Sequence, residues 1–249
     1  MTLRRAPGPV CFECNGEQAC REELEVVRAD HGVRVRAPAL GLEVDLVEHL
    51  FASLAGLSVQ SGIAIRVDGP ELPLLDGAAL ELALAVRALE PPRSPPRLRV
   101  AAESRLVLGA SEYTFAPGSG VHIDVQVDFE PIGKQSASWD GSAARFFADI
   151  APARTFGFRR DAAMLRAKGR AAHVDPHSVL IIEDDGSIAA PGGPARPNEL
   201  ARHKLLDLAG DLYLFGGPPL GRVAARRPGH ANNHEAVRQA LARGILVRA

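Results

Sequence analysis

The spacing of apolar residues predicts one helix in the first half of the chain and a longer one near its end. The first covers 44–57, where apolar positions recur every three or four residues and Gly56 marks the end. The second begins after the Pro/Gly-rich turn 191–197 with Asn198 as a suitable N-cap, and nothing breaks its pattern before Gly210. Both predicted helices carry ionisable side chains among apolar ones.

Alternating and short continuous apolar runs predict strands elsewhere in the chain. The expected strands cover 33–36, 62–68, 98–108, 113–116, 121–129, 179–182 and 221–226, with 10–12 as a further candidate. The other expected helices cover 76–89, with Asp76 as N-cap, and 142–150, 161–168 and 232–242. Because the strands cluster instead of alternating strictly with helices, the pattern favours an α+β fold.

A proline-rich segment, Pro91–Arg97, divides the chain. Its four prolines remove backbone donors and resist both helix and sheet. We therefore expect an N-terminal domain at 1–92, whose first 44 residues have a weak pattern, a linker at 93–97 and a C-terminal domain at 98–249. Each half is expected to hold a small sheet layered against two helices.

Composition narrows the class of protein. The 249 residues are 46% hydrophobic and 24% charged, which is typical of a globular protein, and the net charge of −1 argues against electrostatic binding of nucleic acid. No apolar run is long enough to span a bilayer, and the N-terminus lacks the pattern of a secretion signal. A cytoplasmic location without an obligatory protein partner is the expectation.

Three cysteines lie near the start of the chain. Cys11 and Cys14 have the two-residue gap of a metal or redox motif, but no second pair follows at the usual distance, and Cys20 stands alone. The favoured interpretation is reduced thiols without a special role, and a structural metal or a redox function is the alternative.

Two of the ionisable residues on the second helix have the spacing of metal ligands. His203 and Asp207 are four residues apart, so both project from one face, and Asp211 extends that face by another turn. An imidazole and a carboxylate suit Zn²⁺, which in catalytic sites takes one more protein ligand and a water. A His–Asp pair on a solvated helix face is the alternative.

His49 from the first helix can complete this set. His49, His203 and Asp207 would then bind Zn²⁺, which lowers the pKa of bound water toward about 7. Glu48, next to a ligand in sequence, would accept the proton of that water as general base. The alternative for Glu48 and His49 is a solvated pair at a helix start.

Four further residues fit the hydrolysis of an acyl group. Lys204 and Thr155 could stabilise the oxyanion formed at the acyl carbonyl. His230 could protonate the leaving nitrogen, with Asp211 keeping its imidazole charged. Thr155 could equally be an ordinary strand residue, and His230 a hydrogen-bonded polar group in a turn.

Five segments in order resemble the UDP-3-O-acyl-N-acetylglucosamine deacetylases. They are Val47–Leu57, Gly69–Gly77, Ala153–Phe158, Arg202–Leu212 and Gly229–Asn233. The resemblance implies two domains of similar topology with zinc between them, and hydrolysis of the N-acetyl group of UDP-3-O-acyl-N-acetylglucosamine in lipid A biosynthesis.

The resemblance also assigns residues position by position. It matches His49, His203 and Asp207 to the metal ligands. It matches Glu48, His230, Lys204, Thr155 and Asp211 to the catalytic residues, and Phe156 to an aromatic that contacts substrate together with Lys204 and Thr155. The implied partner is a small molecule, an acylated UDP-amino sugar, and peripheral contact with a membrane surface is a further expectation.

Several segments depart from the family pattern. The Gly-Leu-His-Ser/Thr-Gly motif of the opening strands has no match, Glu130-Pro131 replaces a His-Pro, the segment 172–178 differs, and the loop after His230 reads one residue short. These departures leave two alternatives open. One is a deacetylase acting on a different N-acetylated sugar, and the other is a catalytically silent relative that binds a nucleotide sugar or a protein.

Overall fold

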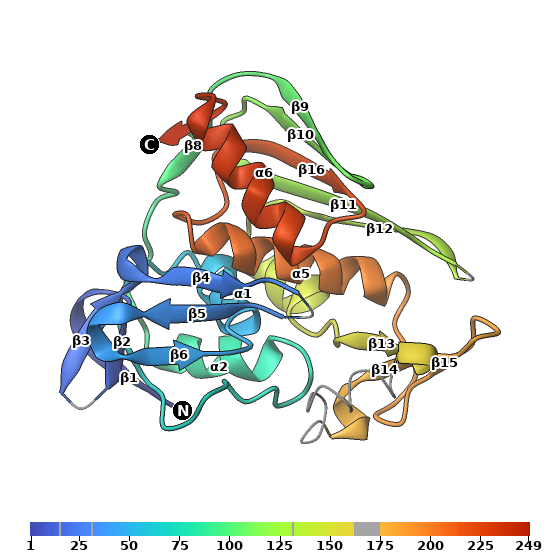
Figure 1. Cartoon of the computed structure of the whole chain (residues 1–249), viewed down its shortest axis with the longest axis horizontal. Helices are drawn as coiled ribbons and strands as arrows, with labels where there is room; N and C mark the ends of the chain where they lie inside the picture. The colour runs from blue at the N-terminus through green and yellow to red at the C-terminus, as the bar shows by residue number, and fades with distance from the viewer. Residues whose placement is uncertain (15, 31, 131, 162–174) are drawn as a thin grey trace.

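The computed structural model describes residues 1–14, 16–30, 32–130, 132–161 and 175–249. Its helices and several small sheets form an α+β fold, as the clustering of strands predicts (Figure 1). None of the helices in these ranges is both long and apolar enough to cross a membrane.

The N-terminal half contains two sheets and two helices. The larger sheet has the order β1-β7-β2-β3, in which β7 is antiparallel to β1 and parallel to β2. Its strands are β1 (Thr2–Pro9), β2 (Cys11–Cys14), β3 (Glu17–Cys20) and β7 (Ser61–Arg66). The smaller sheet joins β4 (Glu25–Arg28), β5 (Arg34–Ala37) and β6 (Leu42–Val44). The helices are α1 (Glu48–Gly56) and α2 (Leu80–Ala88), with 3-10 turns η1 (Arg21–Glu23) and η2 (Pro38–Leu40).

The C-terminal half is built on a five-stranded sheet with the order β12-β11-β16-β10-β9. Its strands are β9 (Ser104–Leu108), β10 (Ser111–Ala116), β11 (Val121–Phe129), β12 (Gly133–Trp139) and β16 (Gly221–Arg226). Only β11 and β16 of this sheet run parallel, and β8 (Leu98–Val100) pairs separately with β17 (Leu246–Arg248). The long helices are α5 (Glu199–Tyr213) and α6 (His230–Ala242).

A smaller three-stranded sheet lies apart from the five-stranded one. It joins β13 (Phe156–Phe158), β14 (Leu180–Ile182) and β15 (Ile188–Ala189). The remaining helical turns are α3 (Ala143–Arg145), which continues into the π-helical turn η3 (Phe146–Ile150), η4 (Arg159–Asp161) and η5 (Pro176–Ser178).

Helix α5 lies across the middle of the molecule, with the five-stranded sheet on one side and α1 on the other (Figure 1). Apolar side chains from both halves form one continuous core cluster, which includes Phe51 and Leu54 of α1 and Leu205 and Leu208 of α5. Burial of this surface, at about 25 cal/mol per Å² of apolar area, is the main force that holds α1 against α5.

Glycine permits an unusually close approach of these two helices. A Cβ atom placed on Gly210 of α5 would lie 2.2 Å from the carbonyl oxygen of Glu48 and 3.2 Å from the amide nitrogen of Ala52. No side chain fits there, so the backbones of α1 and α5 meet directly at the start of α1.

Hydrogen bonds join the two halves near the end of α5. The Tyr213 hydroxyl donates to the carbonyl of Val59 at 2.8 Å, and the Gln60 amide donates to the carbonyl of Gly216 at 3.1 Å. The buried Arg21 guanidinium also bonds Gln60 and lies 5.2 Å from the centre of the Tyr213 ring. The end of α5 is therefore fixed to the N-terminal half.

Most predicted strands are present in the structure, but β1, β3, β4, β6, β12, β15 and β17 were not predicted. Strand 121–129 and the approximate positions of strands 33–36, 62–68, 113–116, 179–182 and 221–226 agree with the structure, and candidate 10–12 lies at the start of β2. The expected strand 98–108 is two strands in different sheets, because β8 pairs with β17 and β9 with β10. Of the helix expected at 161–168, Asp161 belongs to the 3-10 turn η4 and the other residues lie outside the described ranges.

The starts of α1 and α2 differ from the prediction, whereas α5 begins after the predicted N-cap residue. Helix α1 begins at Glu48, because Val44 belongs to β6 and Leu46 has a positive φ of 60°. Asp76 is not an N-cap: its carboxylate accepts from the amide of Ala78, and α2 begins only at Leu80. Asn198 occupies the N-cap position of α5 with left-handed backbone, but its side chain makes no capping hydrogen bond.

Helix α6 begins at His230, two residues earlier than predicted. The segment after His230 is therefore the first turn of α6 and not a loop, and its shortness relative to the family stays a prediction. The position of His230 in the first turn determines which later residues share its face, since positions three and four residues further on lie beside it.

The interpretation of three reduced thiols is also wrong. Cys11 and Cys20 form a disulfide, and Cys14 is the free cysteine. The reason is the register of the β2–β3 pair, which places Cys11 directly opposite Cys20. Neighbouring positions on antiparallel strands bring Cβ atoms within disulfide reach.

We expect Gly210→Ala to destabilise the protein. Alanine favours a helix over glycine by about 1 kcal/mol. Here, however, the added methyl group meets backbone atoms that cannot rotate away, and overpacking of this kind costs about 1–3 kcal/mol. Denaturant unfolding should show a lower midpoint than the wild type, whereas Gly120→Ala, which adds a Cβ to open space, should change it little. A stabilised Gly210→Ala variant would mean that α1 and α5 are not in backbone contact.

Candidate metal centre

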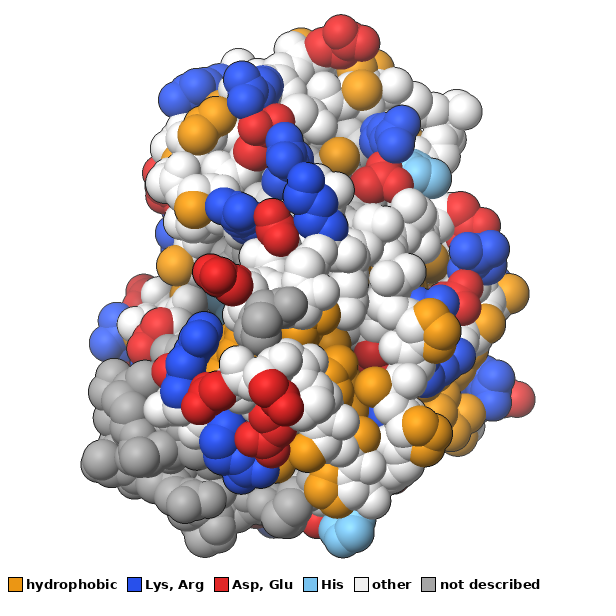
Figure 2. Space-filling view, turned by 90° about the vertical axis from the view of Figure 1, so that its right-hand side faces the viewer, with side chains coloured by type: hydrophobic (Ala, Val, Ile, Leu, Met, Phe, Trp, Pro, Cys, Tyr) orange, Lys and Arg blue, Asp and Glu red, His pale blue; other side chains and the backbone are white. Residues whose placement is uncertain are grey.

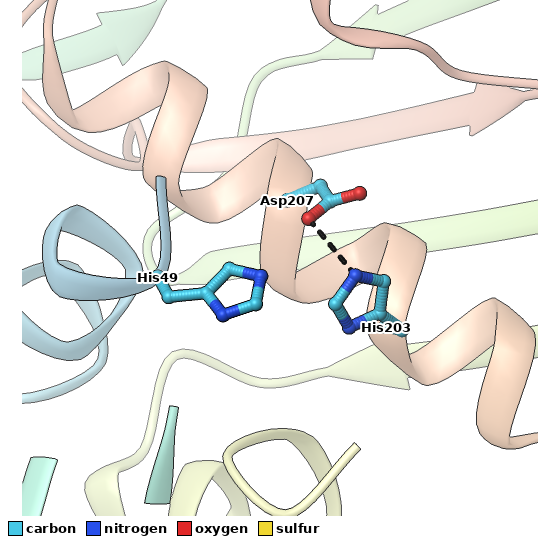
Figure 3. Close-up of side chains that lie close together, drawn as sticks. All are labelled: His49, His203 and Asp207. Carbon is cyan, nitrogen blue, oxygen red and sulfur yellow. Dashed lines mark ion pairs between the residues drawn. The ribbon is translucent and has the colours of Figure 1, made fainter. Parts of the chain in front are cut away.

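Three buried side chains from α1 and α5 converge at the point where these helices meet. His49 projects from α1 toward His203 and Asp207 of α5 (Figure 3). One potential ligand atom from each residue lies within 4.8 Å of the other two, and each residue exposes 5% of its surface or less. The structure thus brings together the three residues that the sequence predicts as metal ligands.

Backbone carbonyls hold both imidazoles. Nδ1 of His49 lies 3.0 Å from the carbonyl oxygen of Ala78, and Nδ1 of His203 lies 3.0 Å from that of Ala153. Because a carbonyl oxygen only accepts, each Nδ1 carries the hydrogen, which leaves the lone pair on Nε2. In His203 this Nε2 lies 3.4 Å from Oδ1 of Asp207. The tautomer is thus the one that can bind a cation through Nε2.

The electrostatics of the three residues also suit a cation. Burial lowers the pKa of His49 to about 3 and lowers that of His203, so both rings are held neutral. Burial alone would raise the pKa of Asp207, but the positive charges of Lys204 and His230 lower it. Neutral imidazoles and an ionised carboxylate are the forms that bind metal.

One buried atom supports this interpretation independently. Oδ1 of Asp207 has no hydrogen-bond partner among the described residues, although it is removed from solvent. A buried carboxylate oxygen without a donor is costly. A divalent cation bound by His49, His203 and this oxygen would compensate it, so the donor set fits a metal such as Zn²⁺.

Glu48 stands beside the ligands at the first turn of α1. Its Oε2 accepts from the backbone amide of Val33 at 2.9 Å, and burial raises its pKa. Gly32 has a φ of +122°, and a Cβ there would lie 3.2 Å from Oε1 of Glu48. The loop before β5 therefore holds this carboxylate in place, and a raised pKa makes the group a better proton acceptor.

Lys204 and Phe156 lie against the two candidate ligands of α5. The Lys204 ammonium donates to Oδ2 of Asp207 at 2.8 Å and lies 5.4 Å from the centre of the Phe156 ring. Phe156 in turn packs edge-on against His203, with ring centres 5.8 Å apart. The positive charge and the aromatic ring thus lie next to the candidate ligands.

Thr155 lies between the two halves of the molecule. Its backbone amide donates to the carbonyl of Gly77 at 2.6 Å, and its own carbonyl accepts from Leu180. The preceding Arg154 forms an ion pair at 2.9 Å with Glu199, which is fully buried at the start of α5. These bonds fix Thr155 relative to α5.

His230 and Asp211 form a buried pair next to Asp207. Nδ1 of His230 lies 2.9 Å from Oδ2 of Asp211, and Nε2 lies 3.8 Å from Oδ2 of Asp207. Burial alone would lower the pKa of His230, but the carboxylates of Asp211 and Asp207 raise it to about 9. At neutral pH this imidazole can therefore donate a proton from Nε2.

The structure also shows contacts that the sequence analysis missed. The hydrogen bond from the Val33 amide to Glu48 could not be predicted, because every residue except proline has a backbone amide and the residue type does not show where it donates. Asn233 and His234 both donate to Asp211. Asn233 and His234 follow His230 by three and four positions. If the helix had been predicted to begin at His230, this spacing would have placed both residues on the same face as His230.

Apolar side chains gather near Phe156. They form a separate cluster around Leu180, Ile182 and Leu200, with half-buried Phe129, Ile132, Phe156, Phe158, Ile188, Ala190 and Ala195 packed against it. Figure 2 shows the side of the molecule that lies at the right in Figure 1. Hydrophobic side chains gather in its lower half, at the level of β13–β15. A ligand at the candidate centre would therefore have apolar surface beside it.

The fold and the site together define an α+β protein with a buried group of two histidines and one aspartate that suits a single metal ion. Residues 10–242 match the model of the UDP-3-O-acyl N-acetylglycosamine deacetylase (LpxC) family. The chain therefore belongs to this family.

Individual relatives support the same assignment. The chain is 37% identical over 208 residues to a UDP-3-O-acyl-N-acetylglucosamine deacetylase of Myxococcus xanthus, and the match covers 81% of this chain and 65% of the relative. It is 35% identical over 209 residues to that of Shewanella violacea (81% and 68% covered), and 35% identical over 203 residues to that of Brucella ovis (80% and 71% covered). The chain thus spans about two thirds of the length of these relatives.

We expect metal binding to require ligands from both helices. Asp207→Ala and His49→Ala should each lose stoichiometric Zn²⁺, as measured by elemental analysis after gel filtration. A metal that binds only the native state stabilises it by about 2.7 kcal/mol at a hundredfold excess over Kd. Added Zn²⁺ should therefore raise the melting temperature of the metal-free wild type but of neither variant.

Asp128→Ala is the matched control for these variants. Asp128 is a half-buried carboxylate of β11 that forms an ion pair with Arg227. This variant should bind Zn²⁺ like the wild type. Normal Zn²⁺ content in Asp207→Ala and His49→Ala would show that the metal is bound elsewhere.

Proposed function

We propose that this chain is a zinc-dependent deacetylase that hydrolyses the N-acetyl group of UDP-3-O-acyl-N-acetylglucosamine and releases acetate, a step of lipid A biosynthesis. Membership of the family supports the reaction. The observation that carries the proposal for this chain is the convergence of His49, His203 and Asp207 beside the buried carboxylate of Glu48.

The proposed general base is Glu48. Zn²⁺, when bound, lowers the pKa of water and polarises the acetyl carbonyl. Glu48 takes a proton from the attacking water, because burial raises the pKa of its carboxyl and the Val33 amide fixes its orientation. The oxygen of that water then adds to the acetyl carbon.

The proposed acid is His230. As the bond between the acetyl carbon and the sugar nitrogen breaks, the nitrogen takes the proton from Nε2 of His230, so that acetate and a free amine result. Asp211 holds the imidazole through Nδ1 and favours its charged form. Lys204 and Thr155 are proposed to stabilise the negative charge on the carbonyl oxygen, which is the role that a fixed cation and a hydroxyl can take.

The apolar cluster at β13–β15 supports an acylated substrate. Phe156 belongs to this cluster and also contacts His203, so apolar surface continues up to the proposed ligands. We propose that this surface contacts the acyl chain of the substrate while Phe156 and Lys204 contact the sugar. An unacylated sugar would leave that surface exposed to water.

We also propose two domains of similar architecture with the zinc site between them, separated at 93–97. In support, each half pairs one larger sheet with two helices, and the candidate ligands come from α1 of one half and α5 of the other. The cytoplasmic location expected from the sequence stays a prediction, as does peripheral contact with a membrane surface.

Acetate release from two substrates tests the proposed function. We expect the zinc-loaded full chain to release acetate from UDP-3-O-acyl-N-acetylglucosamine much faster than from UDP-N-acetylglucosamine. Activity confined to the unacylated sugar, or to a different N-acetylated sugar, would replace the proposal with the alternative of a paralogous deacetylase. Tight Zn²⁺ binding without hydrolysis of any of these amides would indicate a silent relative.

Glu48→Gln separates catalysis from metal binding. The variant keeps the size of the side chain but cannot accept a proton, so kcat should fall by about 10²–10⁴-fold. Its Zn²⁺ content should remain that of the wild type, since Glu48 is not a proposed ligand. Glu43→Gln, at an exposed carboxylate of β6 outside the candidate centre, should keep both properties. Wild-type turnover by Glu48→Gln would refute the assignment of the base.

A further inference from the structure

Asp211 receives hydrogen bonds from three side chains of α6, not from His230 alone. His230 Nδ1 lies 2.9 Å from Oδ2 and 3.1 Å from Oδ1, the Asn233 amide donates to Oδ2 at 2.7 Å, and His234 Nε2 lies 3.0 Å from Oδ1. The three donors occupy positions one, four and five of α6, which lie on one face of a helix.

His234 makes this contact from a buried position. The side chain exposes 1% of its surface, and its ring packs edge-on against Phe215 with centres 5.6 Å apart. Because a carboxylate only accepts, Nε2 must carry the hydrogen. Nδ1 has no partner within the described ranges, so the bond to Asp211 is the polar contact that the ring makes there. An apolar residue would fill this space without leaving a buried nitrogen unpartnered.

The geometry gives His234 a specific effect on Asp211. A carboxylate bound by one imidazole alone can turn about its χ2 torsion, which is a broad, shallow rotor. Donors on both oxygens fix its plane, because His234 binds Oδ1 while Asn233 binds Oδ2. Asn233 is itself tied to the sheet, since its Oδ1 accepts from the Tyr113 hydroxyl at 2.6 Å. His234 is therefore the donor that can be altered without cutting this link to the sheet.

We propose that His234 is a positioning residue: by fixing the carboxylate of Asp211, it orients His230 so that Nε2 faces the reacting nitrogen of the substrate. The proposal rests on the proposed function, which assigns proton donation to His230. Asn233 and His234 thus hold the carboxylate that binds the acid, and neither is a proposed metal ligand.

Kinetics of His234→Leu and His234→Gln test this role in the zinc-loaded full chain. Leucine removes the donor, and we expect kcat to fall by about 10–100-fold, as is usual when a supporting hydrogen bond is lost, with KM little changed. Glutamine places an amide nitrogen the same number of bonds from Cα as Nε2 and should restore most of the rate. Equal losses in both variants, or wild-type kcat in His234→Leu, would overturn the proposal.

Val237→Ala is the matched control. Val237 lies in the core on the same helix, so its truncation should lower the melting temperature without lowering kcat. A large fall in kcat in this variant would show that the rate follows general destabilisation of α6 instead of the bond to Asp211, and would also overturn the proposal.

Histidine ¹⁵N NMR supplies a readout that does not depend on turnover. In the wild type we expect His234 to be protonated at Nε2, and the Nδ1 proton of His230 to give the downfield signal of a strong hydrogen bond. This signal should weaken in His234→Leu and persist in His234→Gln. If it persists unchanged in His234→Leu, the proposal fails. If the wild type shows the expected signals but releases no acetate, the proposed function fails while the orientation of His230 by His234 stands.

Discussion

The direct contact between the backbones of α1 and α5 is the constraint on which the rest of the site depends. Gly210 admits the carbonyl of Glu48 into a space where any side chain would collide. This contact sets the distance between two helices that carry all three candidate ligands, the proposed base and Asp211. Both helices are buried in one core cluster, so packing holds their positions. The polar side chains that they carry are therefore held in fixed positions as well.

Buried charge is the main cost of this arrangement, and the structure offsets it with paired groups. Asp207 and Asp211 are both ionised in the interior, and Lys204 and His230 lie against them. Burial alone would raise the pKa of Asp211, but the charge of His230 and the hydrogen bonds from His230 and His234 lower it to about 2. Removing one partner would leave the other charge uncompensated, which generally costs more than the pair contributes. The charged residues are thus organised as pairs, and Oδ1 of Asp207, which has no hydrogen-bond partner in the described part of the chain, is the atom proposed to bind the cation.

The sequence allowed the fold class and the pairing of His203 with Asp207 to be predicted, because both follow from local signals. Helical periodicity places His203 and Asp207 on one face, and the resemblance supplied His49 from a distant helix. The ends of elements were predicted less well, since they depend on contacts distant in the chain. The Asp76 carboxylate accepts a hydrogen bond from Ala78 in its own loop and not from the first turn of a helix. The expected strand 98–108 is divided because β8 pairs with the last strand, β17. The Cys11–Cys20 bond likewise follows from the register of β2 and β3 and not from the spacing of the cysteines.

The position of α5 has a consequence for how the molecule assembles. His203 and Asp207 are neighbours on a single helix, whereas His49 reaches them only after α1, which is distant in sequence, has docked on α5. Contacts between distant segments form late, because the entropy of closing long loops must be overcome first. A chain with only α5 formed therefore offers a cation two donors, and the complete set exists only in the native molecule. The ion would then bind at the end of folding. Its binding energy would stabilise the native state and would not direct the earlier steps of folding.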